Sequence, residues 1–157
     1  LKTLATQLLA DDSEEPFINT INSFLTEYQD LAIDALLLLG WYYQRRGEHK
    51  DAIINFQKVL KLCPNSALAY SAQGLSNLYL NKFNDCIKDM KKAIEFSRSN
   101  DIWQQLNALV IALEKLDNIK ETKKICYWAL EINKKNPSLI PLELIVKFTE
   151  KMAKELI

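Results

Sequence analysis

Apolar residues recur at intervals of three and four along most of the 157-residue chain, the spacing that places them on one face of a helix. The pattern predicts helices over residues 1–10 and 15–28, helix pairs between residues 33 and 137, and a last amphipathic helix beginning at Pro141. Three glycines and four prolines offer too few turns for a fold of many strands. We therefore predict an all-α protein.

The best-patterned stretch combines small, aromatic and apolar residues at fixed intervals. Its ordered positions are Leu36, Leu39, Gly40, Tyr43, Ala52, Phe56 and Pro64. The series resembles the signature of the tetratricopeptide repeat (TPR), whose units of about 34 residues each form two antiparallel helices. Leu36 stands where the signature has a tryptophan, and the other positions fit.

These positions have physical roles in a helix pair. Gly40 permits the close approach of two helices, and Ala52 is the small residue expected at their crossing. Tyr43 and Phe56 are expected to fill the interface between the helices. Gly47 would supply the turn that joins them.

The pattern recurs twice in weaker form. Equivalent residues in the second unit are Tyr70, Gly74, Phe83, Cys86, Met90 and Ala93. In the third unit Val110 replaces the glycine and Thr122 replaces the small residue. Only the apolar spacing of Leu106, Leu109 and Leu113 marks this unit, with Ala129 and Leu130 in its second helix.

The resemblance implies a single domain built as a right-handed superhelix of stacked antiparallel helix pairs. Its expected parts are an N-terminal helix pair at residues 1–32, three TPR units at 33–66, 67–102 and 103–137, and a capping helix at 138–157. The capping helix would be amphipathic through Leu144, Ile145, Phe148, Met152 and Leu156.

Charge argues against polyanionic partners. Lysine plus arginine equal aspartate plus glutamate at twenty each, so no net field attracts nucleic acid or an anionic membrane. The distribution is uneven, because residues 1–34 hold seven acidic residues and one lysine. This acidic stretch is either a solvated face or a docking surface.

Cysteine usage favours a reducing, cytoplasmic environment. Cys63, Cys86 and Cys126 are odd in number and form no C-x-x-C pair. The sequence has no apolar run long enough to span a bilayer. Leu1 opens the chain without a methionine or a signal-peptide pattern, so we expect a soluble protein and leave open that it is a fragment.

The residues that carry catalysis do not form a recognisable pattern in this sequence. His49 is the only histidine, and its place after the turn is better explained by packing or exposure than by catalysis. The cysteines fit buried positions, and adjacent carboxylates such as Asp11 and Asp12 fit helix capping. We expect no enzyme, metal site or cofactor.

The segment from Ala35 to Tyr43 is apolar almost all round, so Leu37 and Trp41 need a cover beyond their own helix pair. The family geometry places the first helix of each pair on the concave side, with Trp41 and Tyr79 as natural anchors. The partner-binding residues so implied are Leu37, Trp41, Gln44, Arg45, Leu68, Ser71, Leu75, Leu78, Tyr79, Gln104, Asn107, Ile111 and Lys115.

Two alternatives bear on this surface. Leu37, Trp41 and Tyr79 could pack against the N-terminal helices, because apolar stripes at helical spacing usually belong to a core. Many TPR proteins hold acidic chaperone tails with a clamp of lysines, asparagines and an arginine. This chain has Leu37, Trp41 and Ala72 in clamp positions, so an apolar peptide is the expected ligand.

The function predicted from the sequence is a protein–protein interaction module, an adaptor or scaffold that binds a partner peptide or helix in a partly apolar concave groove. One alternative is a dedicated chaperone, because the arrangement of helices resembles the translocator chaperones of bacterial type III secretion. The other is a self-assembling structural domain of a larger protein. Such a homo-oligomer would pair through the acidic N-terminal face or the apolar C-terminal helix.

Overall fold

The computed structural model describes residues 14–27, 32–98, 102–135 and 141–153, and all regular structure within them is helical. The helices are α2 (Glu14–Glu27), α3 (Ala32–Arg45), α4 (His49–Leu62), α5 (Ala67–Tyr79), α6 (Phe83–Phe96), α7 (Trp103–Lys115), α8 (Ile119–Lys135) and α9 (Leu142–Ala153). α2 and α9 confirm two of the predicted helices, whereas the helix predicted over residues 1–10 lies outside the described ranges. None of the described helices is long and apolar enough to cross a membrane.

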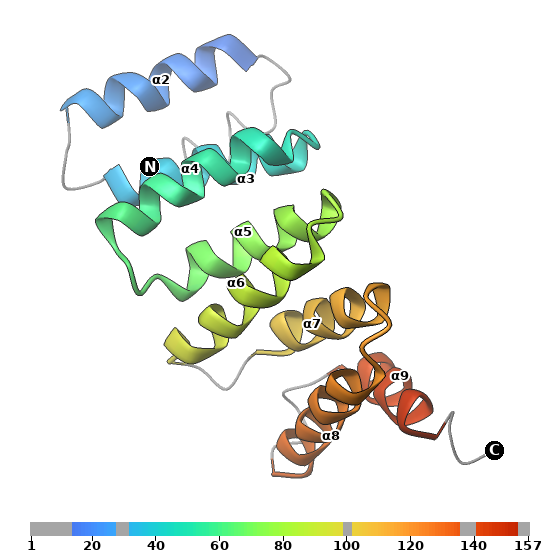
Figure 1. Cartoon of the computed structure of the whole chain (residues 1–157). Helices are drawn as coiled ribbons and strands as arrows, with labels where there is room; N and C mark the ends of the chain where they lie inside the picture. The colour runs from blue at the N-terminus through green and yellow to red at the C-terminus, as the bar shows by residue number, and fades with distance from the viewer. Residues whose placement is uncertain (1–13, 28–31, 99–101, 136–140, 154–157) are drawn as a thin grey trace.

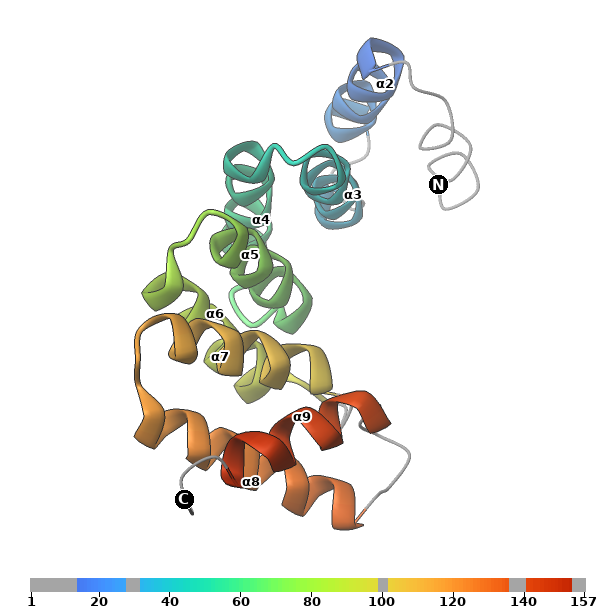
Figure 2. The same ribbon diagram turned by 90° about the vertical axis from the view of Figure 1, so that its right-hand side faces the viewer.

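Consecutive helices lie side by side and antiparallel, so the chain runs back and forth along a stack (Figure 1). The first helices α3, α5 and α7 contact one another more extensively than the second helices α4, α6 and α8 do. Figure 2 shows the stack from the side, with α3 beside α4 near one end and α8 beside α9 at the other. This arrangement confirms the predicted superhelix of stacked antiparallel helix pairs.

The same turn joins the two helices of each pair. Gly47, Asn81 and Asp117 have positive φ angles of 79°, 57° and 52°. The residue after each of them donates its N–H to the carbonyl five positions earlier, at 2.8 to 2.9 Å. Glycine adopts this backbone freely, and asparagine and aspartate are the side-chain-bearing residues that tolerate it best. The turn therefore recurs with the repeat, although only Gly47 was predicted.

The first helix pair is closest where Gly40 meets Phe56. A Cβ atom at Gly40 would lie 2.4 Å from a ring carbon of Phe56, so a side chain there cannot fit without movement. In the second pair, a Cβ atom at Gly74 would lie 2.9 Å from the methyl carbon of Met90. The third pair has fully buried Val110 at this place. The predicted close approach at Gly40 is thus observed.

We expect Gly40→Ala to lower the free energy of unfolding by about 1–3 kcal/mol, because the fully buried Phe56 ring has little room to move. Gly74→Ala should cost less than Gly40→Ala, about 1 kcal/mol, since its closest neighbour is the end of the flexible Met90 side chain and the Asp89 Cβ atom, at 3.1 Å, needs to move only slightly. Urea unfolding followed by circular dichroism compares the two variants. Equal losses of unfolding free energy in the two variants would show that the contact with Phe56 does not determine the cost of Gly40→Ala.

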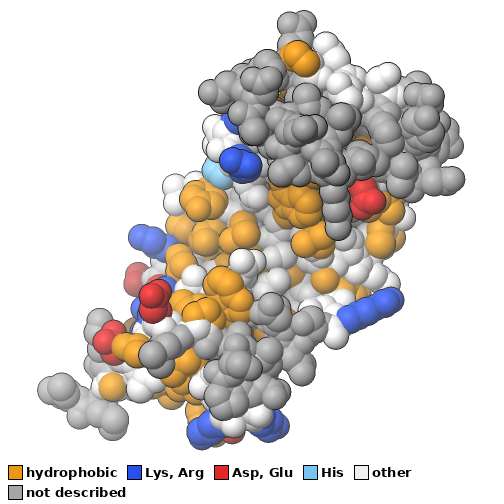
Figure 3. Space-filling view, turned by 180° about the vertical axis from the view of Figure 1, so that it is seen from behind, with side chains coloured by type: hydrophobic (Ala, Val, Ile, Leu, Met, Phe, Trp, Pro, Cys, Tyr) orange, Lys and Arg blue, Asp and Glu red, His pale blue; other side chains and the backbone are white. Residues whose placement is uncertain are grey.

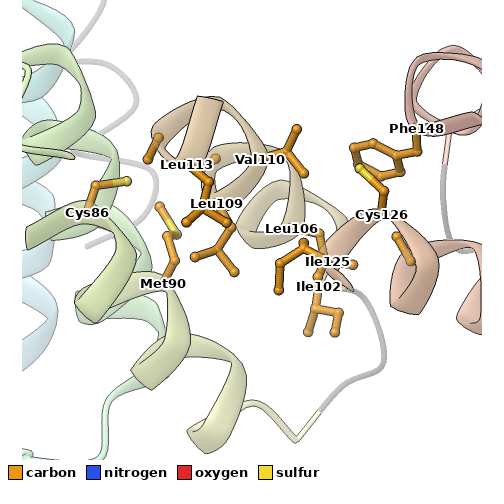
Figure 4. Close-up of a cluster of buried hydrophobic side chains, with 13 residues drawn as sticks. Cys86, Met90, Ile102, Leu106, Leu109, Val110, Leu113, Ile125, Cys126 and Phe148 are labelled. Atoms are coloured by element: carbon orange, nitrogen blue, oxygen red, sulfur yellow. The ribbon is translucent and has the colours of Figure 1, made fainter. Parts of the chain in front are cut away.

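The largest buried cluster joins α6, α7, α8 and α9 (Figure 4). Met90 of α6 points toward Leu109 of α7, and Phe148 of α9 lies beside Cys126 of α8. All four side chains are fully buried. The amphipathic last helix is therefore part of the core, with Phe148 as its anchor.

α2 covers one side of α3. The cluster between them contains Ile18, Ile21, Ala35, Leu39, Tyr42 and Tyr43. Leu39 and Leu36 both belong to the repeat pattern, but Leu39 packs in the cluster with α2, while Leu36 packs with Phe56 of α4. Leu37 and Trp41 belong to the cluster that includes α4 and α5. The contacts of α2 thus fall on a different side of α3 from Leu37 and Trp41.

Candidate functional site

One flank of each first helix joins the next first helix of the stack. Residues seven apart on a helix lie on nearly the same side, so two positions per helix mark this flank. We call them the seam residues: Leu37, Gln44, Ser71, Leu78, Asn107 and Glu114.

The seam between α3 and α5 combines an apolar contact with hydrogen bonds. Leu37 is only 6% exposed and shares a cluster with Ala69 and Ala72 of α5. The Gln44 amide Nε2 donates to the Ala72 carbonyl oxygen and to Ser76 Oγ, each at 3.0 Å. Leu37 and Gln44 were both predicted to bind a partner, but in the structure they hold neighbouring repeats together.

The seam continues in the same way toward the C-terminus. Gln105 Nε2 of α7 donates to Ser71 Oγ of α5 at 3.1 Å. Lys147 Nζ of α9 donates to Asn107 Oδ1 of α7 at 3.0 Å, and Lys151 pairs with the Glu114 carboxylate. The last helix therefore makes the contacts that a further first helix would make.

The other flank of the first helices carries the remaining predicted residues. We call it the open face, made of Asp34, Trp41 and Arg45 in α3, Leu68, Leu75 and Tyr79 in α5, and Gln104, Ile111 and Lys115 in α7. On α5, Leu68 is 51% and Tyr79 is 69% exposed, while Leu75 is half-buried. Figure 3 views the stack from the side opposite to Figure 1 and shows apolar side chains gathered through its middle, with charged ones toward the edges.

The floor and the edges of the open face differ in chemistry. Trp41, Leu75 and Ile111 are half-buried at equivalent places in three helices and form an apolar floor. Arg45 and Lys115 are exposed at equivalent places in α3 and α7, on either side of Tyr79 in α5. That edge is cationic, so it favours a carboxylate over a cation beside a bound apolar segment.

Tyr79 is exposed but held in place. Its ring stacks on His49, the first residue of α4, with centroids 4.7 Å apart and an angle of 2° between the planes. The sequence predicted packing or exposure for His49, just after the turn; in the structure the His49 ring packs on Tyr79. A ring fixed before binding loses less conformational entropy on contact with a partner.

The buried thiols of Cys86 and Cys126 are unreactive. Cys86 and Cys126 are fully buried, and burial raises the pKa of Cys86 to about 12 and that of Cys126 to about 11. Both thiols are protonated at neutral pH, and a protonated thiol is a poor nucleophile and metal ligand. Across the described ranges, no three His, Cys, Asp or Glu residues converge as metal ligands would.

A buried polar cluster between α5 and α6 was missed by sequence analysis. Asp89 is 5% exposed and accepts hydrogen bonds from Gln73 Nε2 at 3.0 Å and from Asn77 Nδ2 at 2.8 Å. Burial raises the pKa of the Asp89 carboxyl, although the two amide donors oppose that shift. The cluster lies between paired helices, away from the open face, and its role is structural.

Comparison with known proteins identifies the repeat. Residues 33–66, which span α3 and α4, match the family model described as the tetratricopeptide repeat. The chain therefore contains a tetratricopeptide repeat at these residues. A search of curated protein sequences gives no significant match.

The TPR fold extends well beyond the matched residues. The solved complex of the TPR2B domain of yeast Sti1 with pHsp70 is similar to this chain, with a TM-score of 0.69 and 17% sequence identity. The similarity covers 80% of this chain and 98% of that domain. At this level of identity, the match shows a shared fold and carries no residue correspondence.

Proposed function

We propose that this chain is a protein-interaction module whose open face binds an apolar segment of a partner protein. The observation that carries the proposal is the exposure of Leu68 and Tyr79 on one side of α5, above half-buried Leu75. Clustered exposed apolar side chains favour contact with another molecule, and tyrosine is enriched in protein interfaces.

The size of the floor suits a short segment. Packed helices lie about 8–10 Å apart, so Trp41, Leu75 and Ile111 would span about 20 Å across three first helices. An extended segment of about six residues covers that length. We propose that its apolar side chains contact the floor while the Tyr79 ring packs against its side.

Two further observations support a protein ligand of apolar character. The TPR2B domain of Sti1, which shares the fold, is described in complex with pHsp70. In this chain Leu37 and Ala72, which stand in clamp positions, are buried apolar residues of one cluster and offer no polar group to an acidic tail. An apolar segment is therefore the ligand we propose for the open face.

The test begins with peptides selected from a random displayed library on the full chain. We expect Leu68→Ser and Tyr79→Ala each to weaken binding of the selected peptides by about thirtyfold, or about 2 kcal/mol, because both would be interface hot spots. Isothermal titration calorimetry with synthetic copies of the peptides measures the affinities.

Matched controls come from the second helices. Ile54 and Leu62 of α4 are 50% and 56% exposed, close to the 51% of Leu68, but lie outside the open face. Ile54→Ser and Leu62→Ser should leave the affinity unchanged. Peptides that respond to the control substitutions, and not to the α5 substitutions, would refute the proposal.

A further inference from the structure

The outer side of α8 carries exposed aromatic residues that belong neither to the core nor to the open face. Tyr127 is 58% exposed and its neighbour Trp128 is 40% exposed. Ile119, at the start of the same helix, is 57% exposed. Large aromatic side chains left in water are costly, and clusters of them mark interaction surfaces.

α8 also carries a surplus of positive charge. Its residues include five lysines against two glutamates, an excess of three positive charges. Both glutamates pair with lysines, and Lys124 and Lys134 of α8 are among those partners. Glu121 accepts from Lys91 at 3.3 Å and lies 3.5 Å from Lys124, while Glu131 accepts from Lys134 at 2.6 Å. The hydrogen bond from Lys91 lowers the pKa of Glu121, so the carboxylate stays ionised and partnered.

The lysines surround the aromatic pair. Lys120 and Lys134 stand seven residues before and after Tyr127, on nearly the same side of the helix. At 1.5 Å per residue they are about 21 Å apart along the axis. Lys124, one turn before Trp128, is exposed as well. We call this surface the α8 face: Lys120, Lys124, Tyr127, Trp128, Glu131 and Lys134, whose three lysines exceed its one glutamate by two positive charges.

We infer that the α8 face is a second docking surface, and that its partner is a protein segment bearing acidic residues around one or two apolar side chains. The apolar side chains would cover Tyr127 and Trp128, and carboxylates would meet Lys120 and the other lysines. This inference is independent of the proposed function of the open face. Together the two surfaces would let one chain bridge two proteins.

Charge favours protein over nucleic acid as the occupant. Glu121 and Glu131 remain on α8 among the lysines, and the whole chain has no net charge. A phosphate backbone presents only negative charge and gains affinity from the number of cations it contacts. A protein segment can instead place its carboxylates opposite single lysines.

The test uses three defined probes and the full chain labelled with ¹⁵N. Two synthetic peptides, each of about 15 residues to match the helical length of the face, share one pattern of leucine and phenylalanine; one carries glutamates between them and the other lysines. The third probe is oligo-dT. We expect only the glutamate peptide to bind with shifts in the amide signals of residues 119–135, and its affinity to fall with added salt.

Variants separate the contributions of shape and charge. The double variant Tyr127→Ser, Trp128→Ser should bind the glutamate peptide about tenfold more weakly, or weaker still. The double variant Lys120→Glu, Lys124→Glu should lose affinity by a similar factor. The matched charge control is Lys50→Glu with Lys58→Glu on α4. These lysines flank exposed Ile54, and Phe56 of the same helix is fully buried, so the control surface has no exposed aromatic ring. Tyr79→Ala is the control for the open face, whose cationic edge also favours carboxylates. Neither control should alter the amide shifts of residues 119–135 or the peptide concentration that half-saturates them.

Four results from the probes would overturn the inference. The first two are amide shifts confined to α3, α5 and α7, and no binding of the glutamate peptide at all. The other two are binding of the lysine peptide as tight as that of the glutamate peptide, and binding of oligo-dT that is tighter. An equal loss in the α4 charge variant would also refute it, because attraction would then be general. Circular dichroism confirms that each variant keeps its helices.

Discussion

Replacing Phe148 with alanine is expected to lower the free energy of unfolding by about 3–5 kcal/mol, because it removes a fully buried ring from the core that joins α7, α8 and α9. The polar contacts of Lys147 and Lys151 with α7 cannot hold α9 alone, since partly exposed polar contacts each contribute about 1 kcal/mol or less. Urea unfolding followed by circular dichroism measures the loss.

A control in the same helix is Val146→Ala. Val146 is 49% exposed, so its truncation should change stability by less than about 0.5 kcal/mol. Hydrogen exchange should also show the amides of α9 losing protection first in Phe148→Ala. Similar losses for the two variants would contradict the anchoring role of Phe148.

The second large effect is expected at Asp89. Asp89→Ala leaves the amides of Gln73 and Asn77 without their buried acceptor, and each such group costs about 1–3 kcal/mol. We therefore expect a loss of about 2–5 kcal/mol in the free energy of unfolding, measured by chemical denaturation at neutral pH. A loss below about 0.5 kcal/mol, as for a surface position, would show that the polar cluster does not contribute to the free energy of unfolding.

Asp89→Asn distinguishes charge from hydrogen bonding. Burial raises the pKa of Asp89 in the folded state, so the folded protein holds this proton to higher pH than the unfolded chain does. The stability that Asp89 contributes is therefore full at low pH and declines as pH rises through its raised pKa. Asp89→Asn should lack that decline. A decline that persists in the variant must come from other groups.

Much of the fold follows from local residue patterns. Gly40 and Phe56 specify how the first helix pair meets, and helical periodicity alone was enough to place α9. Both signals are short-range, because they depend on one helix or one pair. The left-handed turns at Asn81 and Asp117 could also have been found, since they stand 34 and 70 residues after Gly47, in register with the repeat.

The division between seam and open face could not be obtained from one helix at a time. Leu37 and Trp41 share an apolar stripe, and only the position of α5 decides which of them is sealed. Gln105 did carry a signal, because it occupies a place where the first two units have alanine. A polar residue in an otherwise small, buried position indicates a specific partner, here Ser71.

The polar cluster carried a similar signal. Gln73, Asn77 and Asp89 stand where the third unit has Leu109, Leu113 and Ile125. Three polar residues at core positions of a single unit predict hydrogen bonds among themselves, because a buried polar group without a partner is costly. Gln73 and Asn77 do donate to Asp89, although Gln73 Oε1 has no partner among the described residues. Comparing the units position by position would have revealed the cluster, whereas reading apolar periodicity alone concealed it.

The way α9 docks makes the stack extendable in design. Its lysines reach Asn107 and Glu114 just as Gln105 reaches Ser71 from α7, so the docking surface for α9 is a generic one. A duplicate of the α7–α8 hairpin grafted ahead of α9 would offer α9 the same two acceptors again. Such a lengthened chain should remain folded, with α9 docked on the duplicated hairpin instead of on the original one.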